Sequence, residues 1–239
     1  MEMVGNGVIM VRNAILIYLL GTILLVIVLV GYIASSIVNK PQYYINIEGP
    51  LYVALAVNSL LVVIVSILEY IGFRQLSNLG SVYRFGVYGA VLQLVSLPFS
   101  IVGAVYYIQT LENSYKVSNI PGFMMQALPV KVNSLTYLGA AGSLINLVGW
   151  LLVFVVLYKL GSDNGNSIVK TGSLATIIGL ILAISVVSYV PMIYSSYNAI
   201  NTTFILLLFM FLVIGGLIVF IGIIMLLVGL TSLARTITR

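Results

Sequence analysis

Residues 204–231 read FILLLFMFLVIGGLIVFIGIIMLLVGLT, a run of apolar side chains and glycines without a single charge. A helix rises about 1.5 Å per residue, so about 20 residues cross the roughly 30 Å hydrocarbon core of a bilayer. The run is long enough for such a crossing. It therefore predicts a transmembrane helix.

The rest of the chain repeats this pattern between widely spaced charges. Of the 239 residues, 62% are hydrophobic and only 6% are charged, whereas about 25% are charged in an ordinary globular protein. Uncharged intervals of 20 to 27 residues separate Arg12 from Lys40, Glu48 from Glu69, Arg84 from Glu112, and Lys131 from Lys159. A longer interval, from Lys170 to Arg235, holds 64 uncharged residues and is divided by the polar stretch 194–203.

These intervals predict an all-α fold, a polytopic integral membrane bundle of six transmembrane helices in a single transmembrane domain covering residues 1–239. The expected spans are 13–37, 50–71, 85–109, 134–158, 171–193 and 204–231. The first apolar run exceeds the 7–15 residues of a signal-peptide core, so we expect a retained helix rather than a cleaved leader.

The cations predict the orientation, because cytoplasmic segments of membrane proteins are enriched in Lys and Arg. With six crossings, one side carries Arg12, Arg74, Arg84, Lys159, Lys170, Arg235 and Arg239, and the other carries Lys40, Lys116 and Lys131. We therefore expect both termini in the cytoplasm and the protein in the plasma membrane. The sequon at Asn201 then falls outside, where it is a candidate N-glycosylation site, and most tyrosines lie near the outer leaflet.

Cations also bracket pairs of spans, which suggests three helical hairpins in series. Close approach through small residues drives helix association in lipid, and such residues recur at heptad-like spacing on four spans. We expect spans 85–109 and 134–158 to pack through the stripes that include Gly89 and Gly142. Spans 171–193 and 204–231 are expected to pack through Gly179 and Gly222.

Three amides, Asn58, Gln93 and Asn146, lie deep in the predicted spans at roughly the same level. An unpaired amide is costly in hydrocarbon, so we expect all three to face the interior of the bundle. Two interpretations remain open. The amides either join helices by hydrogen bonds or form the floor of a polar cavity for a small neutral solute.

The composition argues against catalysis and cofactor chemistry. The chain has no cysteine and no histidine, which removes thiolate nucleophiles and the usual zinc, copper and haem ligands. Phosphate-binding and dinucleotide-binding motifs are absent, and there is no basic cluster for nucleic acid. Glu69 is the most embedded charge, and we expect it to pair with Arg74 or Arg84. We expect neither an enzyme nor a bound cofactor or metal.

The outer connection 112–131 contains PGFMMQALP at 121–129, which is apolar but too short to cross. It is expected to lie on the outer interface, to cover the bundle as a lid, or to contact a partner through its methionines.

Two neighbouring segments carry a family resemblance: EYIGFRQLS at 69–77 and YRFGVYGA at 83–90. With this G-F-R-x-L-S turn followed by a glycine-spaced helix, the chain resembles an uncharacterised multi-pass membrane protein family of thermoacidophilic crenarchaea. The resemblance implies a membrane location and a multi-pass topology. It transfers no functional residues, because the family has no established activity.

The sequence therefore favours a non-catalytic multi-pass membrane protein, an accessory subunit or scaffold that packs against other membrane proteins or itself. Its expected partners are membrane lipids, other membrane subunits or further copies of the chain, and no nucleic acid. One alternative is a passive channel or carrier for a small neutral solute. The other is an accessory protein that interacts with a lipid or a quinone.

Overall fold

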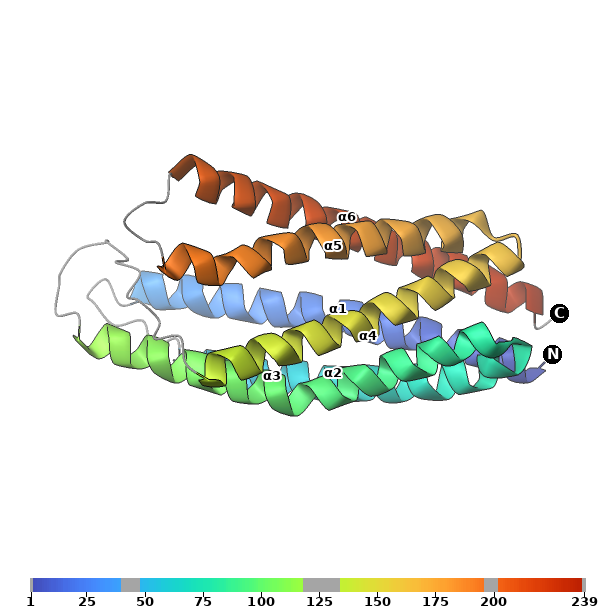
Figure 1. Ribbon diagram of the computed structural model, residues 1–239, viewed down its shortest axis with the longest axis horizontal. Coiled ribbons are helices and arrows are strands. Elements are labelled where there is room, and N and C mark those ends of the chain that lie inside the picture. The colour runs from blue at the N-terminus through green and yellow to red at the C-terminus, as the bar shows by residue number, and fades with distance from the viewer. Residues whose placement is uncertain (1, 40–47, 118–133, 196–201, 238–239) are drawn as a thin grey trace.

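The computed structural model describes residues 2–39, 48–117, 134–195 and 202–237 (Figure 1). Within these ranges the chain forms six long α-helices, two short 3-10 helices and no strand. The helices are α1 (Glu2–Asn39), α2 (Glu48–Leu76), η1 (Ser77–Leu79), η2 (Ser81–Tyr83), α3 (Arg84–Val117), α4 (Ser134–Asp163), α5 (Ser167–Ser195) and α6 (Thr202–Ile237). The all-helical fold expected from the sequence is confirmed.

The helices form a ring in chain order. Each long helix packs against its neighbours in the chain, and α1 also packs against α6, which closes the ring (Figure 1). The most extensive interfaces are α3 with α4 and α5 with α6, followed by α1 with α2. The ring is thus built from three helical hairpins.

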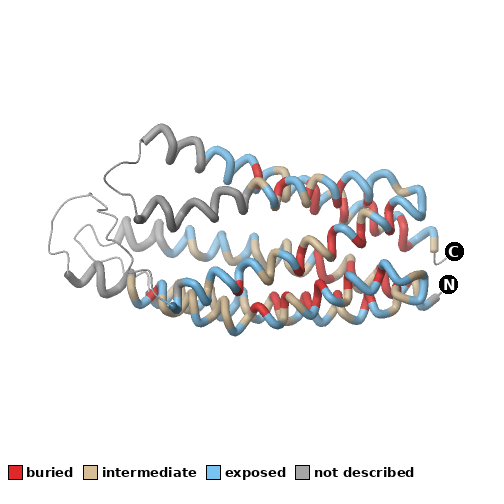
Figure 2. Tube along the Cα trace, viewed as in Figure 1, coloured by how far each residue is buried: buried red, intermediate tan, exposed pale blue. Residues whose placement is uncertain are grey.

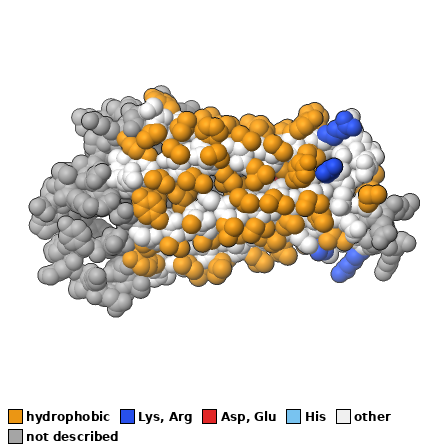
Figure 3. All heavy atoms as spheres, turned by 90° about the horizontal axis from the view of Figure 1, so that it is seen from below, with side chains coloured by type: hydrophobic (Ala, Val, Ile, Leu, Met, Phe, Trp, Pro, Cys, Tyr) orange, Lys and Arg blue, Asp and Glu red, His pale blue; other side chains and the backbone are white. Residues whose placement is uncertain are grey.

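The surface is that of a membrane protein. Five described stretches are long and apolar enough to cross a membrane: Met3–Tyr32, Gly49–Leu79, Ser81–Thr110, Tyr137–Asp163 and Met210–Ile237. Ser167–Leu182 of α5 is a shorter apolar stretch. Figure 3 shows apolar side chains along the length of the molecule, with the blue Lys and Arg side chains visible on this face confined to one end.

The first helix begins well before the predicted start of its span at residue 13. Residues before Arg12 are mostly apolar, and Gly7 lies so close to α2 that a Cβ there would be 2.9 Å from the Gly72 carbonyl oxygen. Val8 and Val11 are fully buried. Arg12 is therefore not the start of the helix: it lies within α1, where its guanidinium donates a hydrogen bond of 2.8 Å to Asn13.

The packed core occupies the half of the bundle that carries both chain termini (Figure 2). Fully buried side chains come from all the long helices, and they include Val8, Val11, Val65, Phe73, Leu76, Val153, Leu157, Leu160, Val169, Leu226 and Leu230, together with Gln93 and Glu69. We call this half the inner half. In the other half, the outer half, most described residues are exposed or only partly buried (Figure 2).

Candidate functional site

Glycine seams join α3 to α4 and α5 to α6. On the α3/α4 seam, a Cβ at Gly89 would lie 2.6 Å from the Gly149 carbonyl oxygen, and one at Gly142 would lie 2.6 Å from the Ser100 amide nitrogen. On the α5/α6 seam, a Cβ at Gly179 would lie 2.7 Å from the Gly215 carbonyl oxygen. Side chains would not fit at these positions. The backbones therefore approach as closely as helices can.

Gly222 completes the α5/α6 seam. A Cβ there would collide with the Thr176 hydroxyl and lie 2.8 Å from the Thr176 amide nitrogen. The structure thus places all four of the named glycines at helix contacts, on the two pairs of helices for which the sequence suggested them.

A polar cluster lies buried between α2 and α3. The Ser66 hydroxyl donates a hydrogen bond of 3.0 Å to Gln93 Oε1, and Gln93 Nε2 donates one of 3.0 Å to Glu69 Oε2. The Ser96 hydroxyl donates to the Gln93 carbonyl oxygen over 2.6 Å. All four residues are at most 1% exposed. We call Ser66, Glu69, Gln93 and Ser96 the Glu69 cluster.

Two aromatic rings from α1 and α4 meet across the bundle near this cluster. The centroids of Tyr18 and Trp150 are 4.9 Å apart, and Trp150 stacks on Phe154 at 5.6 Å. Tyr18 lies close enough to Glu69 to interact with it electrostatically. The Glu69 cluster is thus enclosed by apolar and aromatic side chains.

One carboxylate oxygen of the cluster, Glu69 Oε1, has no hydrogen-bond partner among the described residues. This atom is buried. Ionisable groups inside a membrane bundle are rare and costly, and they mark functional positions more often than structural ones. The Glu69 carboxyl is the one described acidic group that the bundle encloses.

The predicted ion pair of Glu69 with Arg74 or Arg84 is wrong. Within the described residues, Glu69 bonds only to Gln93, and both arginines are exposed. The reason is helical geometry. Glu69 and Arg74 are five residues apart, which places them about 140° apart around α2, so one faces the core when the other faces outward.

The three amides do not share one environment. Gln93 is fully buried in the Glu69 cluster, and Asn146 on α4 is partly buried with its Oδ1 unpartnered. Asn58 is exposed, contrary to the prediction. Asn58 precedes the buried Val65 by seven residues and so lies on nearly the same side of α2. It is exposed because it belongs to the outer half, where no described helix covers that side.

The outer parts of α1 and α6 expose runs of consecutive residues. Val26, Ile27 and Val28 are 51%, 61% and 59% exposed, and residues 210–214 of α6 are exposed without interruption. Successive helical residues are turned by about 100°. Three therefore cover more than half of the helix circumference, and five cover all of it. We call 26–28 and 210–214 the open segments.

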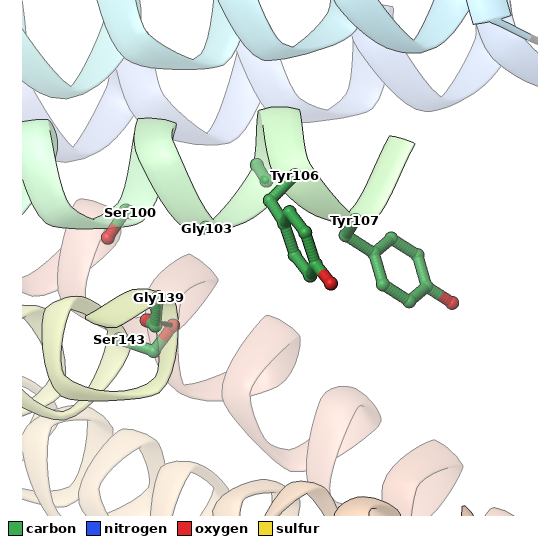
Figure 4. Close-up of a pocket in the computed structure, with 7 residues that line it drawn as sticks. Ser100, Gly103, Tyr106, Tyr107, Gly139 and Ser143 are labelled. Carbon is green, nitrogen blue, oxygen red and sulfur yellow. Dashed lines mark hydrogen bonds between the residues drawn. The ribbon is translucent and has the colours of Figure 1, made fainter. Parts of the chain in front are cut away.

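A hollow of about 270 Å³ opens between α3 and α4 just beyond their closest approach (Figure 4). A Cβ at Gly103 would collide there with the Gly139 Cα atom, so the two backbones lie close together. Ser143 on α4 lies on one side of the hollow, and Tyr106 and Tyr107 project from α3 on the other (Figure 4). Its floor is made of small residues, which allow another backbone to come close.

Two predicted features lie outside the described residues: the sequon asparagine Asn201 and the apolar segment 121–129. Sequence reasoning missed the enclosure of the Glu69 cluster. The signal for it was the spacing of Val62, Val65, Ser66 and Glu69, which places all four on one side of α2.

No curated protein and no solved structure matches the chain. A family model described as a protein of unknown function, DUF973, matches residues 5–203, which include the Glu69 cluster, α2 to α5 and nearly all of α1. The chain therefore belongs to the DUF973 family.

Proposed function

We propose that this membrane protein is a non-catalytic accessory subunit or scaffold whose open segments pack against helices of another membrane protein or of a second copy. The observation that carries the proposal is that exposed residues cover more than half of the circumference of α1 at 26–28 and all of the circumference of α6 at 210–214. When all the packing partners of a transmembrane helix are present, the helix exposes only the face that is turned to lipid.

The chemistry of the open segments favours a helix partner over a water path. All eight residues in 26–28 and 210–214 are Val, Ile, Leu, Met or Phe. A passive route for a small neutral solute needs polar groups along its wall, and these segments supply none. An apolar helix from another chain needs no polar groups on these segments, because helix packing in lipid depends on shape and close contact.

Polar groups in the outer half support the same proposal. Asn58 lies ten residues after Glu48, which places its exposed amide about 15 Å along α2 from that charge. A partner helix that bonds to this amide gains about 1 kcal/mol or less. The small-residue floor of the α3/α4 hollow offers a second place where a helix can approach.

The proposal includes six spans with both termini in the cytoplasm of a plasma-membrane protein. The cations support it: Arg74, Arg84, Lys159, Lys170 and Arg235 belong to the inner ends of their helices, on the side of both termini, and Arg12 lies about three turns into α1 from that end. Figure 3 shows blue side chains at that end. Membrane lipids are then the immediate neighbours, and no nucleic-acid partner is expected.

Site-specific photo-crosslinking in native membranes tests the proposal. A photoreactive phenylalanine analogue replaces Ile27 or Leu212 in the open segments. The matched controls carry it at Val155 on α4 or Leu174 on α5, where the side chains are 48% and 46% exposed on well-packed helices. We expect protein-sized adducts from the first two positions only. Adducts of lipid size alone, or equal protein adducts from all four positions, would contradict it.

A further inference from the structure

The buried Glu69 carboxyl has no part in the proposed function. Its side chain is fully enclosed in the inner half, whereas the open segments belong to the outer half. Glu69 Oε2 accepts a hydrogen bond of 3.0 Å from Gln93 Nε2, and Glu69 Oε1 has no partner among the described residues. The Gln93 amide is held in this orientation because its oxygen accepts the Ser66 hydroxyl. Gln93 therefore presents a donor, not an acceptor, to the carboxyl.

The helices packed against α2 supply no counter-charge to this carboxyl. Among the described residues, no cation forms an ion pair with Glu69. The titratable group that α1 brings close is Tyr18, which interacts with Glu69 electrostatically, and a phenol is neutral below about pH 10. The cation of α1, Arg12, donates instead to Asn13 over 2.8 Å. On α3, the residues of the Glu69 cluster are uncharged, and Arg84 is exposed at the start of the helix.

The contacts of Glu69 suit a neutral acid better than an ion. A carboxylate has room for about four hydrogen bonds on its two oxygens, and Glu69 receives one from the described residues. Burying a charge without a counter-charge or further donors costs far more than burying an uncharged polar group. In the neutral acid, Oε2 is the carbonyl oxygen that accepts from Gln93. Oε1 then carries the proton and needs no donor.

We propose that Glu69 is a proton-binding site inside the bundle, and that loss of this proton loosens the contacts of α2 with α1 and α3. In this step the Oε1–H bond breaks and the proton passes to solvent water. The ionised carboxylate then needs donors that the closed bundle does not supply to Oε1, so water must enter beside it. Water enters only if the helices separate at the level of the Glu69 cluster. The site is independent of any partner that the open segments bind.

The composition makes this proton measurable. The chain has five acidic side chains and no histidine or cysteine, so few other groups titrate between about pH 5 and pH 7. A glutamate in water has a pKa of about 4.3. If the folded chain keeps the Glu69 proton above this pH, unfolding releases it, and the unfolding equilibrium constant rises about tenfold per pH unit. The stability that the proton supplies is thus complete below about pH 4 and is lost as the pH rises.

Reversible unfolding of the full chain in detergent micelles, from about pH 5 to about pH 7, measures this slope. We expect the unaltered chain to lose stability about tenfold per pH unit. Glu69→Gln, which has the shape of the neutral acid and no charge, should lose little. Asp163→Asn is the matched control, because Asp163 is an exposed carboxylate paired with Lys159 at 2.6 Å, and this variant should keep the slope. An unaltered chain without the slope would overturn the proposal, as would a slope of equal size in Glu69→Gln.

The single tryptophan reports the loosening itself. Trp150 is 8% exposed, and its ring centroid lies 4.9 Å from that of Tyr18, the neighbour of Glu69. Water that enters beside the ring shifts tryptophan fluorescence to longer wavelength. We expect this shift in the folded, unaltered chain as the pH is raised from about 5 to about 9, below the range in which tyrosine ionises. Glu69→Gln should show no shift. A constant emission maximum in the unaltered chain, or an equal shift in Glu69→Gln, would overturn the link between the proton and the helix contacts.

Discussion

The α5/α6 seam permits a quantitative test, because α6 has glycines inside the contact, such as Gly222, and a glycine outside it, Gly216. A Cβ at Gly222 would lie 2.8 Å from the Thr176 amide nitrogen and 2.9 Å from the Gly172 carbonyl oxygen. Both of these are backbone atoms, which do not move independently of α5. At Gly216, six residues away on the same helix, nothing lies within 4 Å of the position that a Cβ would take.

Gly222→Ala should therefore destabilise the protein relative to Gly216→Ala. Ordinary contact begins at 3.4 Å, so the helices must separate by roughly 0.5 Å, and a gap of this size forfeits about a quarter of each van der Waals contact beside it. Overpacking of this kind costs about 1–3 kcal/mol. Both variants gain the same helix propensity, about 1 kcal/mol, so the difference between them isolates the packing cost.

Thermal unfolding in detergent, followed by circular dichroism, measures this difference. For a chain of this size, 1 kcal/mol shifts the midpoint by about 2–4 °C. The Gly222→Ala midpoint should thus lie roughly 2–12 °C below that of Gly216→Ala, and Gly222→Leu should lie lower still. Equal midpoints for the two alanine variants would refute the reasoning that the seam depends on backbone contact.

Other contacts yield further predictions. Gln93→Leu leaves Ser66 and Glu69 without their hydrogen-bond partner and should lower the free energy of unfolding in detergent by about 1–3 kcal/mol or more. Gln109→Leu, at an exposed position of the same helix, is the control and should cost little. Similar losses in the two variants would show that the Glu69 cluster is not intact. Tyr83→Phe removes the hydrogen bond of 3.0 Å from the Tyr83 hydroxyl to Asp163 Oδ2 and should lower the free energy of unfolding by about 0.5–1.5 kcal/mol. Tyr88→Phe, at an exposed tyrosine, is the control. An unchanged unfolding midpoint in both variants would mean that this hydrogen bond does not hold η2 to the end of α4.

The helices were predictable because charge is so scarce in this chain. Each predicted span lies within one helix, since uncharged runs of 20 or more residues have no alternative to helix in lipid. Arg12 misled the prediction of the first boundary. A single cation is tolerated inside a helix when its long side chain reaches a polar neighbour, as Arg12 does with Asn13.

The site was only partly predictable. Small residues at regular spacing pointed to the α3/α4 and α5/α6 contacts, because close packing in lipid demands small side chains. The partner of Glu69 was not found from proximity in the sequence, because the angle around the helix decides which side chains meet. The exposure of the outer half could not be predicted from the sequence. Residues 26–28 would be equally apolar whether they contacted lipid, a second copy of the chain or another protein.

The mass of the native complex tests the central claim most directly. The protein is extracted from its own membranes with a mild detergent and weighed by native mass spectrometry, with any co-purifying chains identified. We predict a complex heavier than the single chain of 25.9 kDa, made of further copies or of other membrane proteins. The account would be contradicted if every mild extraction yielded only the single chain and if that chain, reconstituted in liposomes, let a neutral solute pass through the membrane.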